Sequence, residues 1–232
     1  MNIAIIPARG GSKRIPRKNI KFFCGKPMLA WSIEAAKKAG VFDHIIVSTD
    51  DHEIAEVARN YGAEVPFLRP DHLSDDYTGT GAVVKHATTW VKQHLGQPDY
   101  ICTLYATAPF VNAADLAKSL TFLQQSDKQL IFSVTSFPFP IQRAIKLLAD
   151  GSVAMFQPEY YMTRSQDLEP AFHDAGQFYW STLDAVNQQT SAFSEAALAY
   201  QLPRHQVQDI DTLEDWERAE WLFKAQNRLT VK

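Results

Sequence analysis

Apolar residues along this chain follow two alternating periodicities, one typical of buried strands and the other of amphipathic helices. Short apolar runs predict strands at residues 3–6, 45–47, 100–104, 130–134, 176–180 and 199–202, with a weaker one at 65–68. Between these runs, apolar residues spaced three and four apart predict helices at about residues 27–40, 54–61, 81–95, 112–123 and 212–223. Strand and helix therefore alternate over most of the chain.

Local signals refine some of these elements. Pro66 lacks a backbone N–H, so the weak segment around it should be an edge strand. Asn112 with Asp115, and Thr212 with Asp215, have the spacing of a capping pair at the start of a helix. We therefore expect two of the helices to begin at these pairs.

The alternation predicts a single α/β domain over residues 1–232, with a Rossmann-like, mostly parallel sheet and helices on both faces. In such sheets, ligands bind beyond the carboxyl ends of the strands. We therefore expect the loops that follow the strands to lie along one rim of the sheet. These loops contain residues 7–19, 50–51, 69–80 and 105–110.

The alternation stops between residues 137 and 172. Apolar stretches at 145–148 and 153–156, separated by a turn at Asp150–Gly151, predict a hairpin outside the sheet. Many aromatic residues surround it, and an exposed apolar hairpin needs a cover. We predict that 137–172 is the dimerisation segment of a homodimer. The alternative is a flap that lies on its own domain.

Composition narrows the class of protein. The net charge of −3 argues against a general nucleic-acid binder, because such domains are basic overall. No apolar run reaches the length of a membrane span, and the N-terminus enters a strand without a cleavable apolar segment. Cys24 and Cys102 are too few for a disulfide framework. We therefore expect a cytoplasmic protein with no nucleic-acid or membrane partner.

One early loop concentrates positive charge around Gly10–Gly11. No acidic residue precedes Glu34, whereas seven cations do: Arg9, Lys13, Arg14, Arg17, Lys18, Lys21 and Lys26. Adjacent glycines let backbone N–H groups approach a ligand closely, and such groups beside cations form polyphosphate sites. The loop matches neither a Walker A motif nor Gly-x-Gly-x-x-Gly. We interpret it as a polyphosphate-binding loop; the alternative is a solvated basic surface.

Asp209 and Asp211 are candidates for a metal site. Side chains two residues apart in an extended segment point to the same side. Two carboxylates there can hold a hard cation such as Mg²⁺ together with phosphate oxygens. The alternative is that they only cap the helix that follows. The sequence has no histidine pair at zinc spacing and no nucleophile elbow, so it gives no support to covalent catalysis.

With these residues in view, the chain resembles the CMP-sialic acid synthetases and their cytidylyltransferase relatives over essentially its whole length. The opening motif Ile5–Asn19 (IIPARGGSKRIPRKN) is the most specific, and Phe67–Pro70 and Asp209–Thr212 match later motifs in the same order. Within the family, segments 104–110 and 172–179 look most like the branch that activates pseudaminic acid.

This resemblance implies transfer of CMP from CTP to the anomeric hydroxyl of a nine-carbon 2-keto sugar acid (a nonulosonic acid), with release of pyrophosphate. The implied nucleotide site consists of Ala8, Arg9, Gly10, Gly11, Ser12, Lys13, Lys18, Asn19, Arg69 and Thr80. The implied catalytic set is Arg9, Lys13, Lys18, Asp209 and Asp211, and the two aspartates carry Mg²⁺. The implied sugar site consists of Tyr105, Thr107, Arg143, Arg164, His173, Gln177 and Tyr179. In a homodimer, Arg143 or Arg164 would pair with the sugar carboxylate of the neighbouring subunit.

Two segments differ from the sialic acid enzymes. Those enzymes usually carry Gln-Pro-Thr-Ser-Pro-Leu-Arg where this chain has residues 105–111, and Arg-Pro-Asn-Gly-Ala-Ile-Tyr where it has 173–179. Because these segments flank the family's sugar pocket, the differences disfavour N-acetylneuraminate as the substrate. The alternatives are a CMP-sialic, CMP-legionaminic or CMP-Kdo synthetase, or a non-catalytic nucleotide-binding module on the same fold.

Overall fold

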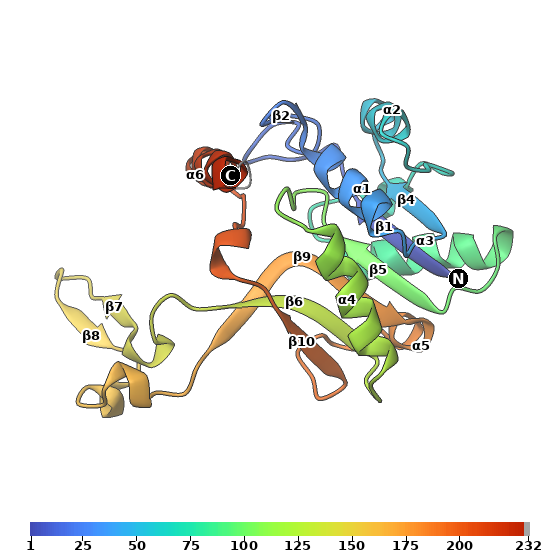
Figure 1. The fold of residues 1–232 in the computed structure, drawn as a ribbon. Helices are drawn as coiled ribbons and strands as arrows, with labels where there is room; N and C mark the ends of the chain where they lie inside the picture. The colour runs from blue at the N-terminus through green and yellow to red at the C-terminus, as the bar shows by residue number, and fades with distance from the viewer. Residues whose placement is uncertain (230–232) are drawn as a thin grey trace.

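The computed structural model describes residues 1–229 and confirms the α/β architecture (Figure 1). Within these residues, six strands form one sheet in the order β10–β6–β9–β5–β1–β4. Their bounds are β1 Asn2–Pro7, β4 His44–Ser48, β5 Tyr100–Leu104, β6 Leu130–Ser136, β9 Phe172–Thr182 and β10 Ala197–Gln201. All are mutually parallel except β9, which runs antiparallel between β5 and β6. The sheet is therefore mixed and mostly parallel, as predicted.

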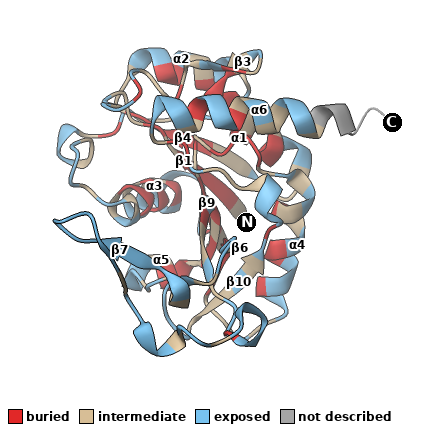
Figure 2. Cartoon of the chain, turned by 90° about the vertical axis from the view of Figure 1, so that its left-hand side faces the viewer, coloured by how far each residue is buried: buried red, intermediate tan, exposed pale blue. Residues whose placement is uncertain are grey.

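Helices cover both faces of the sheet. Their bounds are α1 Met28–Ala39, α2 His52–Asn60, α3 Thr80–His94, α4 Ala113–Gln124, α5 Leu183–Gln188 and α6 Leu213–Leu229. Helices α1, α2 and α4 pack with Phe178 and Trp180 on one face, whereas α3 and α5 pack on Ile3, Ile5 and Ile101 on the other. The central strands β1, β5 and β6 are largely buried between these layers, whereas the edge strand β10 is not (Figure 2). None of the helices in residues 1–229 combines the length and apolar character needed to cross a membrane.

A third apolar cluster joins the two ends of the chain. Ile15 and Phe23, from the segment that follows β1, pack against Ile210 and against Trp216 on α6. The rings of Phe23 and Trp216 meet edge to face, with 5.4 Å between their centroids. This cluster holds α6 beside the cation-rich loop at residues 7–19, called the basic loop below. The residues just before α6 therefore lie next to that loop.

The predicted edge strand at residues 65–68 is wrong. The chain here forms only two isolated bridges, one between Glu64 and Ile46 of β4 and one between Leu68 and Thr49, the residue that follows β4. Pro66 lies between the two bridges and has no N–H to donate, so a continuous ladder cannot form there.

The two predicted capping pairs differ in outcome. Thr212 and Asp215 form a reciprocal capping box: the Asp215 N–H donates to Thr212 Oγ1 (3.2 Å), and the Thr212 N–H donates to Asp215 Oδ2 (2.8 Å). Asn112 caps α4 as predicted. Asp115, however, accepts a hydrogen bond from the Tyr200 hydroxyl at 2.9 Å instead of joining the cap. A tertiary contact has therefore replaced the local one.

Sequence periodicity missed three short elements. Helix α5 has six residues, and the hairpin of β2 (Phe22–Phe23) and β3 (Lys26–Pro27) has two residues in each strand. Elements of this length are too short to establish a hydrophobic period.

Residues 137–171 leave the sheet between β6 and β9. The predicted segment extended to residue 172, but Phe172 already pairs with Ser136 as the first residue of β9. They contain an antiparallel hairpin, β7 (Ile145–Leu147) and β8 (Val153–Met155), which lies away from the body of the molecule (Figure 1). Its apolar side chains face solvent: Phe139 and Leu147 are 79% and 78% exposed, and β7 is exposed throughout (Figure 2). A flap packed on its own domain would bury these side chains, so the structure disfavours that alternative.

Candidate active site

A cleft of about 980 Å³ opens at the carboxyl ends of the parallel strands. The loop after β1, the 69–80 segment, the turn after β5, the start of β9 and the segment before α6 all line it. The predicted residues that line it are Arg9, Ser12, Lys13, Lys18, Asn19, Arg69, Thr80, Tyr105, Thr107, His173, Gln177, Tyr179, Asp209 and Asp211. The rim expected from the sheet topology therefore exists.

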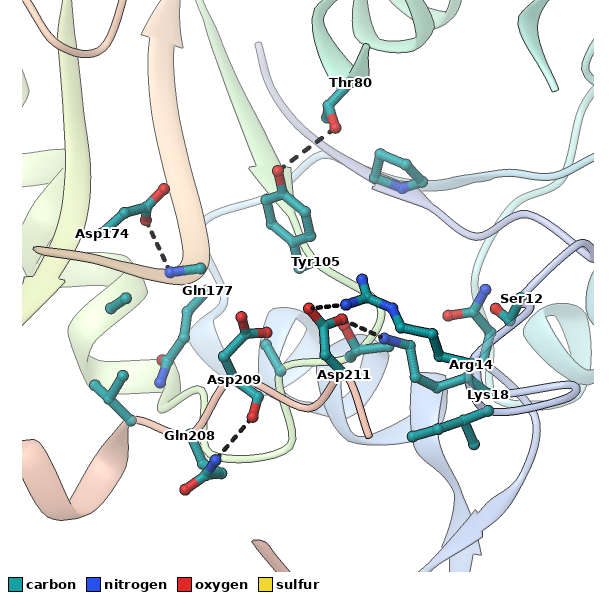
Figure 3. A pocket seen from close by; sticks show the side chains of 18 of the residues that line it. Ser12, Arg14, Lys18, Thr80, Tyr105, Asp174, Gln177, Gln208, Asp209 and Asp211 are labelled. Carbon is teal, nitrogen blue, oxygen red and sulfur yellow. Dashed lines mark hydrogen bonds and ion pairs between the residues drawn. The ribbon is translucent and has the colours of Figure 1, made fainter. Parts of the chain in front are cut away.

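The basic loop and the paired aspartates meet in this cleft (Figure 3). The Lys18 ammonium donates to the Ile210 carbonyl (2.6 Å) and lies 3.4 Å from Asp211 Oδ1. The Arg14 guanidinium lies 2.9 Å from Asp211 Oδ2. Lys18 and Ile210 are 192 positions apart in the chain, so only the tertiary fold brings these groups together.

The seven early cations serve two purposes. Arg17 pairs with Asp51, Lys26 pairs with Glu34, and Lys21 lies over an aromatic ring of α6, so these three tie the loop to neighbouring helices. The other four line the cleft: Arg9, Lys13, Arg14 and Lys18. Charge that is unbalanced along the sequence is therefore partly balanced in space.

Asp76 contacts two of the four cleft cations. Its carboxylate lies 2.9 Å from the Arg9 guanidinium and also pairs with Lys13. The hydrogen bond from Lys13, and then the charges of Lys13 and Arg9, lower the pKa of Asp76 below its ordinary value. Asp76 is thus ionised at neutral pH. It pairs with Arg9 and Lys13, two cations that the sequence assigns to phosphate binding.

Gly10 is required because there is no room for a side chain beside it, and not because of an unusual backbone angle. Neither Gly10 nor Gly11 has a positive φ. A Cβ on Gly10 would lie 2.8 Å from a carboxylate oxygen of Asp51, whereas nothing lies within 4 Å of a Cβ on Gly11. The Gly10 N–H donates to Asp50 Oδ1 (3.0 Å), and the Ala8 N–H extends the ladder between β1 and β4. These N–H groups hold the loop in place instead of facing the cleft.

Asn19 and Arg69 lie on the side of the cleft that the sequence assigns to the nucleotide. Asn19 is buried, and its side-chain amide donates to the Arg9 carbonyl (2.8 Å). Arg69 is only 5% exposed and lies 3.3 Å from Asp50 Oδ1. Burial lowers the pKa of Arg69, and the nearby Asp50 opposes this change. Arg69 Nε is buried and has no hydrogen-bond partner within residues 1–229.

The opposite side of the cleft is built by β5 and β9. The Tyr179 hydroxyl donates to the Asp174 carboxylate, and the ring of Tyr105 lies 5.7 Å from that of Tyr179. The Tyr105 hydroxyl lies 3.5 Å from Thr80 Oγ1. Burial and the hydrogen bond to Asp174 raise the pKa of Tyr179 far above its usual range, so its hydroxyl stays a neutral donor. Gln177 is buried beside this group and donates to a backbone carbonyl before α6.

Asp209 and Asp211 provide the donor chemistry of a hard-cation site. Partial loss of hydration and the neighbouring Asp211 carboxylate raise the pKa of Asp209, whereas Lys18 opposes this rise. Within residues 1–229, no cluster of three or more acidic, histidine or cysteine side chains has the arrangement of a metal site. Mg²⁺ commonly binds through one or two carboxylates plus substrate phosphates and water. The pair therefore fits this ion as part of a site shared with a phosphate ligand.

Two predicted sugar contacts do not line the cleft of their own chain. Arg143 and Arg164 both lie in residues 137–171, the excursion from the sheet between β6 and β9. Arg143 donates to the Ser165 hydroxyl (3.3 Å) and lines a separate hollow with Phe137 and Phe139. These arginines can therefore serve a sugar site only if the excursion reaches another subunit.

Several residues that line the cleft are not among the predicted site residues, and three of them make charged or hydrogen-bonded contacts that bear on the site: Arg14, Asp76 and Asp174. Arg14 belongs to the cation run, so the sequence carries a signal for it. Asp76 follows Asp75 in a polar loop, and Asp174 lies in the 173–179 segment that flanks the family's sugar pocket, but neither has a spacing pattern that assigns it a role. Their contacts with Arg9 and Tyr179 identify them.

Replacing Gly10 with alanine should lower the free energy of unfolding by about 1–3 kcal/mol, because the new Cβ displaces a carboxylate that caps α2 and pairs with Arg17. Gly11→Ala is the matched control and should stay within about 0.5 kcal/mol of the parent. Urea unfolding followed by circular dichroism measures both changes. Equal stability of the two variants would contradict this interpretation of the loop.

Comparison with known proteins identifies the family. Residues 3–213 match the family model described as Cytidylyltransferase. The chain is 46% identical over 224 residues to a protein from Campylobacter jejuni named pseudaminic acid cytidylyltransferase, with 97% of each chain covered. It is 30% identical over 236 residues to a Legionella pneumophila protein named CMP-N,N'-diacetyllegionaminic acid synthase, with 99% of each covered.

A solved structure of CMP:2-keto-3-deoxy-manno-octonic acid synthetase complexed with CTP has the same fold. The TM-score is 0.72 at 15% sequence identity, over 97% of this chain and 99% of that one. The motif order, the cleft and the match over most of the sequence agree, and the chain belongs to the cytidylyltransferase family.

Proposed function

We propose that this protein transfers CMP from CTP to the anomeric hydroxyl of a nine-carbon 2-keto sugar acid, with pseudaminic acid as its substrate. The observation that carries the proposal is the meeting of the basic loop with Asp211 and Asp209 in one cleft. Near full-length similarity to a relative named for pseudaminic acid supports the choice of sugar. We assign the reaction to the cytoplasm, where Cys24 and Cys102, both free thiols in the structure, would stay reduced.

The cleft contributes positioning and charge neutralisation, which are the main contributions of protein to phosphoryl transfer. Arg9, Lys13 and Lys18 hold the triphosphate and stabilise the charge that develops on the leaving pyrophosphate. Arg69 and Thr80 flank the nucleoside. The sugar enters from the β5–β9 side, so its anomeric hydroxyl faces the α-phosphate.

Asp209 and Asp211 would hold Mg²⁺, the ion that the family resemblance implies. When bound, Mg²⁺ neutralises charge on the triphosphate. Arg14 and Lys18 pair with Asp211 in the structure and keep its carboxylate at the edge of the phosphate side.

We further propose a homodimer in which the excursion packs on the neighbouring subunit. The exposed apolar side chains of residues 137–171 supply the contact surface. Arg143 and Arg164 lie outside their own cleft, and a guanidinium suits bidentate binding of a carboxylate. They would therefore reach the sugar carboxylate in the partner's cleft.

CTP must compete with Asp76 for Arg9 and Lys13, so Asp76→Asn should lower the Kd for CTP by a few-fold. The matched control is Asp71→Asn, which removes one negative charge from the same segment but no contact with either cation. Isothermal titration calorimetry measures both affinities. Weaker CTP binding by Asp76→Asn would show that Asp76 supports the nucleotide site instead.

The function is tested with CTP, Mg²⁺ and a panel of 2-keto sugar acids, following pyrophosphate release and CMP-sugar formation. We expect the fastest turnover with pseudaminic acid. Asp211→Asn should reduce kcat roughly 100- to 1,000-fold, as loss of one charge-stabilising group does. The exposed Asp184 on α5 gives the control variant, Asp184→Asn, which should keep the parent's kcat.

Two results would contradict this function. CTP binding without turnover of any sugar would favour a non-catalytic nucleotide-binding module. A higher kcat/KM for sialic, legionaminic or 3-deoxy-octulosonic acid would change the assigned substrate.

The homodimer is tested by mixing two inactive variants. One carries Arg143→Ala and Arg164→Ala and has an intact cleft, whereas the other carries Asp211→Asn and has intact arginines. Mixed dimers contain one complete site, so activity should rise well above the mean of the two variants. Activity equal to that mean, or a sedimentation mass of a single 26.2-kDa chain for the parent, would rule out sharing of the site.

A further inference from the structure

Asp174 is a cleft carboxylate for which the proposed reaction has no role so far. Asp174 lies on β9 and lines the cleft on the side away from Lys18 (Figure 3). Asp76 and Asp211 each pair with two cations of the basic loop. Asp174, in contrast, forms no ion pair with any residue in the described range 1–229. Its negative charge is therefore available to a ligand.

Two hydrogen bonds fix this carboxylate in place. One oxygen accepts from the Gly176 backbone N–H at 2.8 Å, and the other accepts from the Tyr179 hydroxyl. Gly176 has a φ of +63°, so the tight turn of the backbone here favours glycine. Each carboxylate oxygen can accept about two hydrogen bonds, so each keeps an acceptor position after these contacts. Asp174 is thus a rigid, preorganised acceptor.

The side chains around Asp174 are mainly hydroxyl and amide groups, which donate and accept hydrogen bonds equally well. The neutral ones that line this part of the cleft are Tyr105, Thr107, Thr135, Ser136, Gln177 and Tyr179. Such groups bind sugar hydroxyls but distinguish poorly between substituents. A carboxylate is different, because when ionised it only accepts.

We propose that Asp174 is a specificity-determining residue that accepts a hydrogen bond from an acylamino N–H of the sugar. This inference rests on the proposed function, in which the triphosphate occupies the cation side and the sugar lies along β5 and β9. A sugar acid carries its own carboxylate beside the reacting carbon, and Asp174 repels that group. The same charge strengthens a hydrogen bond from an amide. Asp174 therefore turns the sugar so that its carboxylate points away and an acylamino group points toward β9.

The choice of an acylamino donor follows from the substrates of the relatives. The name of the Legionella pneumophila relative specifies a sugar acid with two N-acetyl groups. A sugar of that class presents amide N–H donors in addition to hydroxyls, and a fixed carboxylate selects for a donor at one position of the ring.

The test combines a substitution at Asp174 with a change in the sugar, in the manner of a double-mutant cycle. Parent and Asp174→Asn are assayed with the diacylamino sugar acid and with analogues in which one acylamino group is replaced by hydrogen. For the intact sugar, Asp174→Asn should lower kcat/KM roughly 10- to 100-fold, as loss of a charged hydrogen-bond partner does. The variant should bind CTP as the parent does. With the analogue that lacks the contacted N–H, parent and variant should have similar kcat/KM.

Tyr179→Phe distinguishes recognition of the sugar by Asp174 from the support that Tyr179 gives to the Asp174 carboxylate. It removes the hydroxyl that donates to Asp174 but leaves the carboxylate, so the preference for the intact sugar should persist even where turnover falls. Asp174→Glu is a second acidic variant that keeps the charge, and it should retain part of the preference if the asparagine variant fails to fold.

Equal loss of kcat/KM by Asp174→Asn for the intact sugar and for every analogue would overturn the proposal, because a supporting role affects all sugars alike. Unchanged kinetics in a folded variant would also overturn it. Failure of the proposed function has a different signature, since the parent itself would then bind CTP without turning over any sugar.

Discussion

An apolar contact between the basic loop and α6 holds the site together. Ile15, Phe23, Ile210 and Trp216 are all buried in it. Burying one such side chain contributes roughly 1.5–3 kcal/mol, whereas an exposed ion pair contributes about 0–1 kcal/mol. The ion pairs to Asp211 are therefore a consequence of this packing and do not cause it. The hydrophobic cluster fixes where the two ends of the chain meet, and the charged groups then use that geometry.

The tertiary fold also decides which acidic residues lie beside the cations of the basic loop. Cations are concentrated in one loop, but their acidic partners come from distant segments: Asp51 begins α2, Asp76 lies across the cleft, and Asp211 precedes α6. The fold therefore balances a local excess of positive charge while leaving each cleft pair near the surface, where a phosphate can replace the carboxylate. The cations of the cleft therefore have acidic partners even when no polyanionic ligand is bound.

Much of this site can be predicted from the sequence because the order and direction of the strands decide which loops lie together. The loops after parallel strands lie at one edge of a sheet, so the basic loop, the 69–80 segment and the turn after β5 could be expected along one cleft. The place of Asp211 beside them is expected from the family resemblance. Features that depend on tertiary contacts were not predictable. Asp115 has the spacing of a cap but binds Tyr200, and Asp174 gains its position from a turn in β9 at Gly176. In neither case does a local pattern of residue types reveal the partner.

The separation of 192 positions between Lys18 and Ile210 has a consequence during synthesis. The strands and helices that precede β10 can fold as the chain leaves the ribosome. The cytidylyltransferase site, however, needs Ile210 and α6 to pack on the first loop, and these emerge long after that loop. A nascent chain that has not yet reached Asp209 therefore holds the basic loop without its aspartates, so the site forms only after α6 has been synthesised.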